Sequence, residues 1–477
     1  MENIIQNLTN LLTPASIVPV KGSNNPDYQF LASRINNAER DVVAVASPAN
    51  LDELKALLVF SAEQAFSLFN LLSPGEIGTA AIPSKGDIVV IDLQKMNSIL
   101  DINQKDAYAL IEPGVSYGQL NKHLEDNNIP FVVDYEKNAQ QSVLGSICNR
   151  NFGYTPYGDQ LMMQCGMEVM LADGSLVRTG MGAMPKSNTW QLFKYGYGPY
   201  MDGLFTQSNM GIVTKIGLWL MPKPPAYKPF MLQLPNDSAL EQAVEILRSL
   251  KINMLVPNTV VIASAESEVM QFIDGGLSST FDNNTAEKHQ LGTWNIYGAL
   301  YGIAGNVDVV WGAVEGSLGQ IAGAKFLLID DTANHPIWAQ REKAMLGQFN
   351  KRSADLDSHA SINLHFASPI EGKDALAMQS IISESNAGDL KLINQLALTW
   401  RTLFSQINIS YPKQSADKFA SAKQLANELI QQFTVQGYAV SFADADIQDS
   451  VDGTRHTGLK TLNQRVKKAL DPLQNFG

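Results

Sequence analysis

The chain has 477 residues, of which 45% are hydrophobic and 17% are charged, and its formal net charge is −12. A chain of this length is too long for one ordinary core, so two or three domains are expected, and the composition is that of a globular rather than a disordered protein. The acidic balance comes without any Lys/Arg cluster, which argues against a nucleic-acid partner because nucleic acids need a concentrated basic footprint.

The N-terminal stretch, MENIIQNLTNLLTP, has an early Glu, no basic region and no small-residue cleavage site, so we do not expect a secretory signal. No apolar run reaches the roughly 18 residues that suggest a membrane span. Cys148 and Cys165 lack a CxxC partner and the histidines are scattered, so free thiols are expected and a metal site is not. These features predict a cytoplasmic protein with no membrane partner.

The N-terminal half alternates strands with helices. Residues 1–40 are expected to form a polar helical lead-in with irregular turns. Asn50 with Glu53, and Ser116 with Gln119, fit the N-terminal capping pattern of two helices. Strands are expected at 42–47, 66–72, 88–93 and 107–115. This alternation predicts an α+β fold.

The character of the sequence changes after PKPP at 222–225, a plausible domain boundary. Beyond it, amphipathic segments at 239–250, 374–386 and 416–433 predict long helices between apolar strands. The segment after Gly437 reads as a strand, YAVSFADA, and then a helix. No internal repeat is visible in the sequence.

Residues 142–221 contain an unusual density of glycines between apolar runs. Glycine at this density means a backbone that takes positive φ or lets another group approach closely. Taken alone, the segment also suits a β-rich domain with many turns.

Long strings in the chain resemble the vanillyl-alcohol oxidase and p-cresol methylhydroxylase family of FAD-linked oxidases. They are VVIDLQKMNSIL, ALIEPGVSYGQL, SVLGSI, GYTPYGDQLMMQCGMEVMLADGSLVRTGMGAMP and YGYGPYMDGLFTQSNMGIVTKIGLWLMPKP, with weaker similarity in FASPIEGKDAL and near the C-terminus. The resemblance implies a two-domain fold, in which residues 1–225 and 437–477 form the FAD-binding domain. Residues 226–436 would form an α+β cap domain over the isoalloxazine ring. Family members oxidise para-substituted phenols, with hydride leaving the benzylic carbon for flavin N5.

Four turns can bring backbone N–H donors together on a pyrophosphate, since glycine has no Cβ in the way. They lie at 73–79, 113–115, 142–146 and 211–213, and each alone is equally an ordinary turn. In family order they favour FAD. The residues expected to contact FAD are Gly75, Gly78, Pro113, Gly114, Val115, Ser142, Gly145, Ser146, Tyr154, Gly158, Gly211, Ile212 and Val213.

The active-site positions implied by the resemblance depart from the family pattern. Ile77 stands where relatives carry a phenol-binding Tyr, and Asn149 stands where they carry an Asp close to flavin N5. Ser441 and Phe442 replace the phenolate-binding Tyr-Arg pair. Asn149 cannot take a proton, and neither Ile77 nor Phe442 can donate a hydrogen bond. Loss of one preorganised donor costs on the order of 10²–10³ in rate, so the usual phenol oxidation is not expected.

Two further details bear on the flavin. Some relatives attach FAD covalently through a cap-domain His, but Leu364 stands at the matching place and His365 follows it. A shift of one residue in a strand points the side chain to the opposite face, so non-covalent FAD is expected. Glu76 adds a carboxylate to the predicted pyrophosphate loop, where it would repel a diphosphate.

Two hypotheses follow. The first is an FAD-dependent oxidoreductase acting on an altered, non-phenolic or specialised-pathway small molecule, with Tyr154 or Tyr157 supplying a hydroxyl near the ring. The alternative is a protein that kept the scaffold without redox activity, as a non-redox enzyme or partner subunit unable to bind FAD. The resemblance allows a homodimer, and it leaves oxygen and a cytochrome partner open as electron acceptors.

Overall fold

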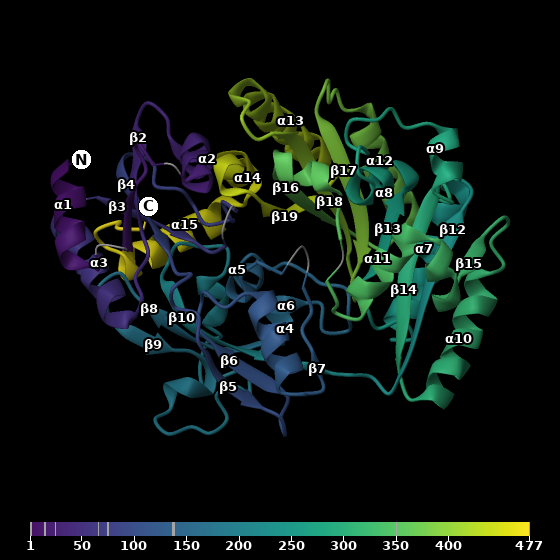
Figure 1. Ribbon diagram of the computed structural model, residues 1–477, viewed down its shortest axis with the longest axis horizontal. Helices are drawn as coiled ribbons and strands as arrows, with labels where there is room; N and C mark the ends of the chain where they lie inside the picture. Colours follow the sequence, from purple (N-terminus) through teal and green to yellow (C-terminus); the bar gives the residue numbers. More distant parts are fainter. Residues whose placement is uncertain are drawn as a thin grey trace. The chain divides into compact units, whose positions relative to one another are not determined.

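The computed structural model describes residues 2–13, 16–23, 25–64, 66–73, 76–135, 139–349 and 351–476. The chain forms two compact units (Figure 1). The first unit comprises residues 1–151, 159–222 and 444–477, and the second comprises 152–158 and 223–443. The units therefore meet along the chain at 222/223 and 443/444, where the sequence suggested 225/226 and 436/437, and the short segment 152–158 belongs to the second unit.

The first sheet of the first unit has helices on both faces. Its strand order is β1-β2-β4-β3, with β1 (Ile17–Pro19) antiparallel to β2 (Arg40–Ala46), and β4 (Gly86–Asp92) parallel to both β2 and β3 (Ser67–Leu71). Helices α1 (Glu2–Leu11) and α3 (Leu51–Gln64) pack on one side through residues such as Leu8 and Leu57. Helix α2 (Pro26–Ile35) packs on the other side through Leu31 and Ile35. Burial on both faces explains the nearly continuous apolar runs of β2 and β4.

The second sheet of the first unit is antiparallel and has the order β5-β6-β10-β8-β9. Its strands are β5 (Ile99–Asn103), β6 (Tyr108–Ile111), β8 (Gln164–Met170), β9 (Leu176–Arg178) and β10 (Ile212–Trp219). The remaining elements of the unit are α4 (Tyr117–Asp126), β7 (Phe131–Val132), α5 (Val143–Cys148), α6 (Gln160–Met163), β11 (Met221–Pro222), α14 (Gln448–Thr454) and α15 (Thr457–Leu470). Strand β5 was not expected from the sequence, because none of its five residues is fully buried and two are exposed, so it lacks a buried apolar run.

The second unit contains an eight-stranded antiparallel sheet of order β15-β12-β14-β13-β17-β18-β16-β19. Its strands are β12 (Ala226–Leu234), β13 (Val260–Ser264), β14 (Trp294–Gly302), β15 (Lys325–Leu327), β16 (His359–Ser368), β17 (Lys391–Leu398), β18 (Leu403–Pro412) and β19 (Ala439–Ala443). Its helices are α7 (Asp237–Ile252), α8 (Ala265–Phe272), α9 (Asn283–Lys288), α10 (Ala304–Leu318), α11 (Pro336–Met345), α12 (Gly372–Glu384) and α13 (Ala416–Val435).

This sheet repeats one topology. Apart from the inserted helices α8, α9 and α11, the elements run β12-α7-β13-β14-α10-β15 and then β16-α12-β17-β18-α13-β19. Each half is a split β-α-β-β-α-β motif with the same strand order. The sequence shows no repeat, so the repetition lies in the fold alone. Strand β19 closes the second half by pairing with β16, which is why residues up to 443 belong to this unit.

The two faces of the sheet differ. One face packs against the long helices, as in the contacts of Phe230 with Trp311 of α10 and of Phe366 with Phe433 of α13. The opposite face carries Phe152, whose ring lies 4.6 Å from that of Phe404 between centroids. We call it the Phe152 face. Helix α11 lies on this face too, because Trp338 stacks on Tyr297 there.

Several expectations about small features can be compared with the described residues. Cys148 and Cys165 are free and buried, and burial raises the pKa of each thiol to about 12. Among the residues that the structure describes, no helix is long and apolar enough to cross a membrane. Within the same ranges, no group of three or more His, Cys, Asp or Glu side chains could hold a metal ion.

Candidate functional site

Three of the four predicted cofactor turns meet in the first unit. Ser142 caps α5: its Oγ accepts from the Gly145 N–H at 3.1 Å and donates to the Pro113 carbonyl at 2.9 Å. The Ser142 N–H donates to Ser73 Oγ at 3.0 Å. The Val143 N–H donates to the Val115 carbonyl, which ties the two turns together a second time. The loop at 73, the turn at 113–115 and the start of α5 therefore form one connected backbone surface.

The glycines of this surface are required by the chain itself. A Cβ on Gly145 would lie 2.7 Å from the Leu72 carbonyl oxygen, and one on Gly114 would lie 2.5 Å from the Leu93 carbonyl oxygen. Contacts under 3 Å between a Cβ and a backbone oxygen do not occur without a shift of the backbone. These glycines thus let strand ends approach the turns, which is a structural reason for their presence beside any contact with a cofactor.

Buried polar atoms without partners cluster in sequence just after this surface. Ser146 Oγ, Asn151 Oδ1 and both amide atoms of Gln160 are buried, and among the described residues none of these atoms has a hydrogen-bond partner. Native proteins rarely leave such atoms unsatisfied, so each calls for a polar group other than those of the described residues, such as that of a ligand or a water molecule. A dinucleotide rich in oxygen and nitrogen acceptors and donors fits that need. The residues present therefore fit FAD.

The remaining predicted cofactor residues lie elsewhere. Ile212 and Val213 are core residues of β10, 0% and 3% exposed. A Cβ on Gly211 would lie 2.7 Å from Val169 Cγ1. Gly158 and Tyr154 belong to the second unit, where Tyr154 packs in a core cluster with Trp338. Gly75 lies outside the described residues.

Asn149 is held in a defined orientation at the C-terminal end of α5. It is 2% exposed, and the Thr79 hydroxyl donates to its Oδ1 at 2.9 Å. Gly78, at φ +68°, precedes Thr79 and a Cβ there would lie 3.5 Å from Asn149 Oδ1. Because Thr79 occupies the amide oxygen, Asn149 presents its N–H groups as donors. The sequence pointed to Asn149, but not to Thr79.

Arg150 follows Asn149 with a left-handed backbone, φ +58°. Its Nε and Nη2 donate to Thr206 Oγ1 at 3.0 and 2.9 Å. Burial and the positive charge of Arg455 lower the pKa of the Arg150 guanidinium. Positive charge is thus concentrated beside α5, where an anion would be favoured.

Ile77 is a core residue of the first unit. It is 3% exposed and belongs to the apolar cluster that contains Leu71 and Ala445. It also lines a cavity of about 200 Å³, together with Tyr28 and Arg34 among others. Arg34 in turn forms a buried ion pair with Asp444 and Asp446, at 3.1 and 2.7 Å.

Ser441 and Phe442 lie on β19 in the second unit. The Ser441 hydroxyl donates to the His365 carbonyl at 3.2 Å, and the Phe442 ring stacks on His365 at 4.7 Å between centroids. His365 also stacks on Phe152, with 6.0 Å between ring centroids. His365 is 6% exposed and Leu364 is 0% exposed. As expected for neighbours in a strand, their side chains are on opposite faces, with His365 on the Phe152 face.

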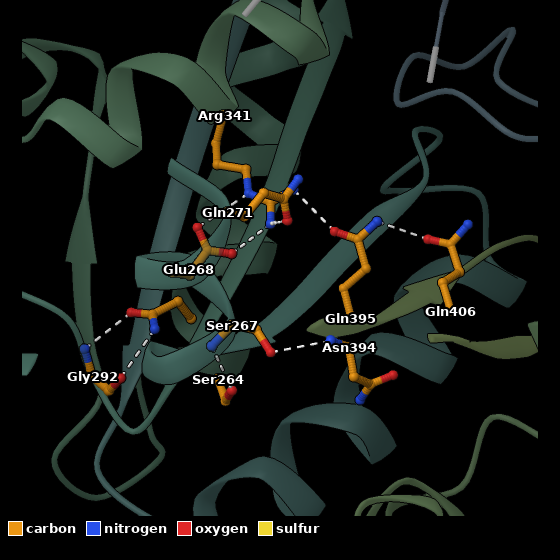
Figure 2. Close-up of polar contacts among 10 residues, drawn as sticks. Ser264, Ser267, Glu268, Gln271, Gly292, Arg341, Asn394, Gln395 and Gln406 are labelled. Carbon is orange, nitrogen blue, oxygen red and sulfur yellow. Dashed lines mark hydrogen bonds and ion pairs between the residues drawn. The ribbon is translucent and has the colours of Figure 1, made fainter. Parts of the chain in front are cut away.

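A buried charged network in the second unit was not predicted from the sequence. Arg341 of α11 and Glu268 of α8 form an ion pair whose side chains are 3% and 0% exposed. Figure 2 shows Arg341 between Glu268, Gln271 and Gln395, and Gln395 bonded in turn to Gln406. Nothing in the local sequence PIWAQREKAM distinguishes Arg341 from a surface cation of a helix.

Comparison with known proteins identifies the class of this fold and site. Residues 42–180 match the family model described as an FAD binding domain. The flavoprotein subunit of 4-cresol dehydrogenase (hydroxylating) from Pseudomonas putida is 31% identical over 464 residues, covering 93% of this chain and 88% of that protein. The 1'-carboxy-chondrochloren decarboxylase of Chondromyces crocatus is 34% identical over 216 residues, 45% of this chain and 40% of that protein.

Solved structures agree. The structure of p-cresol methylhydroxylase with substrate bound has a TM-score of 0.87 and 29% identity, over 99% of this chain and 95% of that one. A 4-ethylphenol oxidase from Gulosibacter chungangensis shares the fold with a TM-score of 0.89 at 24% identity, over 99% of this chain and 95% of that one. The chain is an FAD-binding oxidoreductase homologue. It belongs to the vanillyl-alcohol oxidase and p-cresol methylhydroxylase family of FAD-linked oxidases, with FAD as its cofactor.

Proposed function

We propose that this protein is an FAD-dependent oxidoreductase whose substrate is not held as a phenolate. The observation that carries the proposal is the set of contacts made by Ser441 and Phe442 in the second unit. The Ser441 hydroxyl is bonded to the His365 carbonyl, and Phe442 is stacked on His365. Neither side chain can stabilise an anionic phenolate oxygen, because one hydroxyl is already used and the other side chain has no polar atom.

The first unit, residues 1–151, 159–222 and 444–477, would hold FAD without a covalent bond. The N–H groups around α5 and the turn at 113–115, with Ser146, Asn151 and Gln160, are the groups that would contact it. Arg150 would add positive charge near the diphosphate. The second unit, residues 223–443, would act as the cap. FAD, when bound, supplies a two-electron acceptor.

Asn149 is proposed to orient the reacting group rather than to move a proton. Thr79 fixes its amide, so that the Asn149 N–H groups point to an acceptor atom of the substrate or of the flavin. A buried amide keeps the same charge at every pH, unlike the carboxylate it replaces. Turnover that depends on Asn149 should therefore show no ionisation belonging to this residue.

A substrate with a carboxylate is consistent with one of the relatives. The Chondromyces crocatus protein is named as a decarboxylase, and it matches 45% of this chain. Carboxylic acids are thus included with neutral non-phenolic compounds among the substrates to test. The substrate is a small molecule. The Pseudomonas putida relative is named as a subunit, so a redox partner or a homodimer would complete the assembly, in the cytoplasm.

The test begins with the purified protein and its absorbance spectrum. We expect bound flavin that acid precipitation releases into the supernatant, since no covalent bond is proposed. Anaerobic mixing with 4-cresol should leave the flavin oxidised, whereas a panel of benzylic alcohols and aromatic acids without a phenol should contain a compound that bleaches it. Rapid bleaching by 4-cresol would refute the proposal.

The alternative is a scaffold without redox activity. It predicts a colourless protein that does not take up added FAD, which the match of the FAD binding domain over residues 42–180 does not favour. Protein that remains colourless after dialysis against FAD would establish the alternative.

A further inference from the structure

One row of side chains crosses four neighbouring strands on the Phe152 face of the second unit. The row consists of Gln395 of β17, Gln406 of β18, His365 of β16 and Phe442 of β19. Each of these residues is directly paired with the next one across neighbouring strands. Directly paired residues of antiparallel strands have their side chains on the same face. The row therefore leads from the buried Arg341 network to the aromatic side chains at the other end.

Arg341 fixes the direction of every hydrogen bond in this row. A guanidinium can only donate, so Gln395 must turn its Oε1 to Arg341 Nη1, at 3.1 Å. The other end of the Gln395 amide, Nε2, then donates to Gln406 Oε1 at 2.8 Å. Gln406 has its oxygen occupied, and its Nε2 points away from Gln395 (Figure 2). The hydrogen-bonded part of the row thus ends in a donor, the Gln406 Nε2.

The Gln395 amide, at the start of the row, cannot turn over. The Arg341 Nη2 lies 2.5 Å from Glu268 Oε1, its Nε lies 3.3 Å from Glu268 Oε2, and Gln271 accepts a further bond. Reversing the Gln395 amide would place its N–H groups against the guanidinium and would break both bonds of that amide. The ion pair therefore acts as an anchor that holds the two amides in one orientation.

The end of the row is nearly buried and lacks an acceptor. Gln406 is 9% exposed, and within the described part of the chain its Nε2 makes no hydrogen bond. Its neighbour in the row, His365, is flanked by Phe152 and Phe442. The Gln406 Nε2 is not one of the buried side-chain atoms that lack a partner, so it remains accessible to solvent and to the oxygen atom of an incoming ligand.

We propose that Gln406 is a substrate-binding residue that donates a hydrogen bond to a carbonyl or carboxylate oxygen. Gln395 and Arg341 are positioning residues that act through Gln406. The inference rests on the proposed function, since it names the chemical group that the non-phenolic substrate carries. It also explains how a cap without the Tyr-Arg pair can still recognise a polar group.

The first variant is Gln406→Glu, which keeps the shape and still accepts from Gln395 but turns a second oxygen toward the ligand. The probes are acetophenone and benzoate, titrated by calorimetry into the protein supplied with excess FAD. We expect both dissociation constants to rise at least 10-fold at pH 8. Lowering the pH should strengthen acetophenone binding in the variant but not in the wild type, because the protonated carboxyl group of the introduced glutamate can donate a hydrogen bond. A merely structural defect would not recover in this way.

The matched control is Gln432→Glu, which adds the same charge at an exposed position of α13. Its dissociation constants should equal those of the wild type.

The second variant, Gln395→Glu, tests the positioning role without touching Gln406. A glutamate at 395 accepts from Arg341 and needs a donor on its other side, so the Gln406 amide must turn over and present its oxygen. Acetophenone should then bind at least 10-fold more weakly, while aniline, an N–H donor, should bind more tightly than it binds the wild type.

Two results would overturn the inference. One is a wild type that binds neither acetophenone nor benzoate, and the other is a Gln406→Glu variant that binds both as the wild type does. Failure of the proposed function gives a different result. In that case 4-cresol would bleach the flavin, but acetophenone binding would still depend on Gln406.

Discussion

Removal of Glu268 offers a direct measure of the buried network. In Glu268→Gln the shape of the side chain is kept, but the Arg341 charge stays buried at 3% exposure without its counter-ion. Burial lowers the pKa of Arg341, and the Glu268 contacts more than offset this, so the net shift is upward. Gln271 and Gln395 still accept from the guanidinium, but neutral acceptors cannot compensate a buried charge. Breaking a buried ion pair from one side costs about 3–5 kcal/mol.

This cost should be visible in thermal unfolding. A unit of this size loses about 2–4 °C in Tm for each kcal/mol, so Glu268→Gln should lower the Tm by about 6–20 °C. Circular dichroism and a urea titration give the Tm and the free energy of unfolding. The double variant Glu268→Leu with Arg341→Met removes both charges and should recover most of the loss, since an apolar pair can replace a buried ion pair.

A loss below about 0.5 kcal/mol in Glu268→Gln would refute this reasoning, because that is the effect of an exposed pair. A double variant less stable than Glu268→Gln would also contradict it, since the cost would then lie in packing rather than in the unpaired charge.

Three further predictions concern other sites. Burial lowers the pKa of Lys251 to about 7, against about 10.4 in the unfolded chain. Between these two pKa values the unfolded chain therefore binds one more proton than the folded chain, so the free energy of unfolding should rise by about 1.4 kcal/mol per pH unit from pH 7 to 9. Lys251→Met should remove this rise in urea titrations. A slope that is unchanged in the variant would contradict the prediction. Asn149→Ala should slow flavin reduction by about 10²–10³-fold with FAD content unchanged, and an unaltered rate would remove Asn149 from the site. Arg34→Met leaves the carboxylates of Asp444 and Asp446 buried without a cation, and should cost about 3–5 kcal/mol in unfolding experiments. Arg34→Lys should recover only part, because an ammonium lacks the several fixed N–H groups with which the guanidinium reaches both carboxylates, and full recovery would argue against this geometry.

The capping predictions illustrate what local sequence can establish. At the start of α3, the Glu53 N–H donates to Asn50 Oδ1 and Glu53 Oε2 accepts from the Ala49 N–H. At α4 the Gln119 N–H donates to Ser116 Oγ as predicted, but the Gln119 side chain donates to the Asn97 carbonyl instead of reaching back. A cap is formed by residues three apart, so the sequence contains nearly all of its geometry. The exception arises where a distant carbonyl competes.

The candidate site was predicted only in part, for a related reason. Family strings identified the turns at 113–115 and 142–146, and hydrogen bonds do connect these turns. The strings could not give Thr79 as the partner of Asn149, since the two are 70 residues apart. They also could not distinguish a glycine that approaches a cofactor from one, such as Gly114, that approaches a neighbouring carbonyl.

The sequence by itself determined the family and the cofactor, because these depend on which residues stand at which positions. Tertiary structure alone decided how the polar side chains of the second unit are oriented. Arg341 reaches Gln395 across 54 residues of chain, and the orientation of the Gln406 amide depends on that contact. The sequence does not determine which way a side-chain amide faces. Only a fixed charge that the fold places beside the amide decides which direction its N–H groups point.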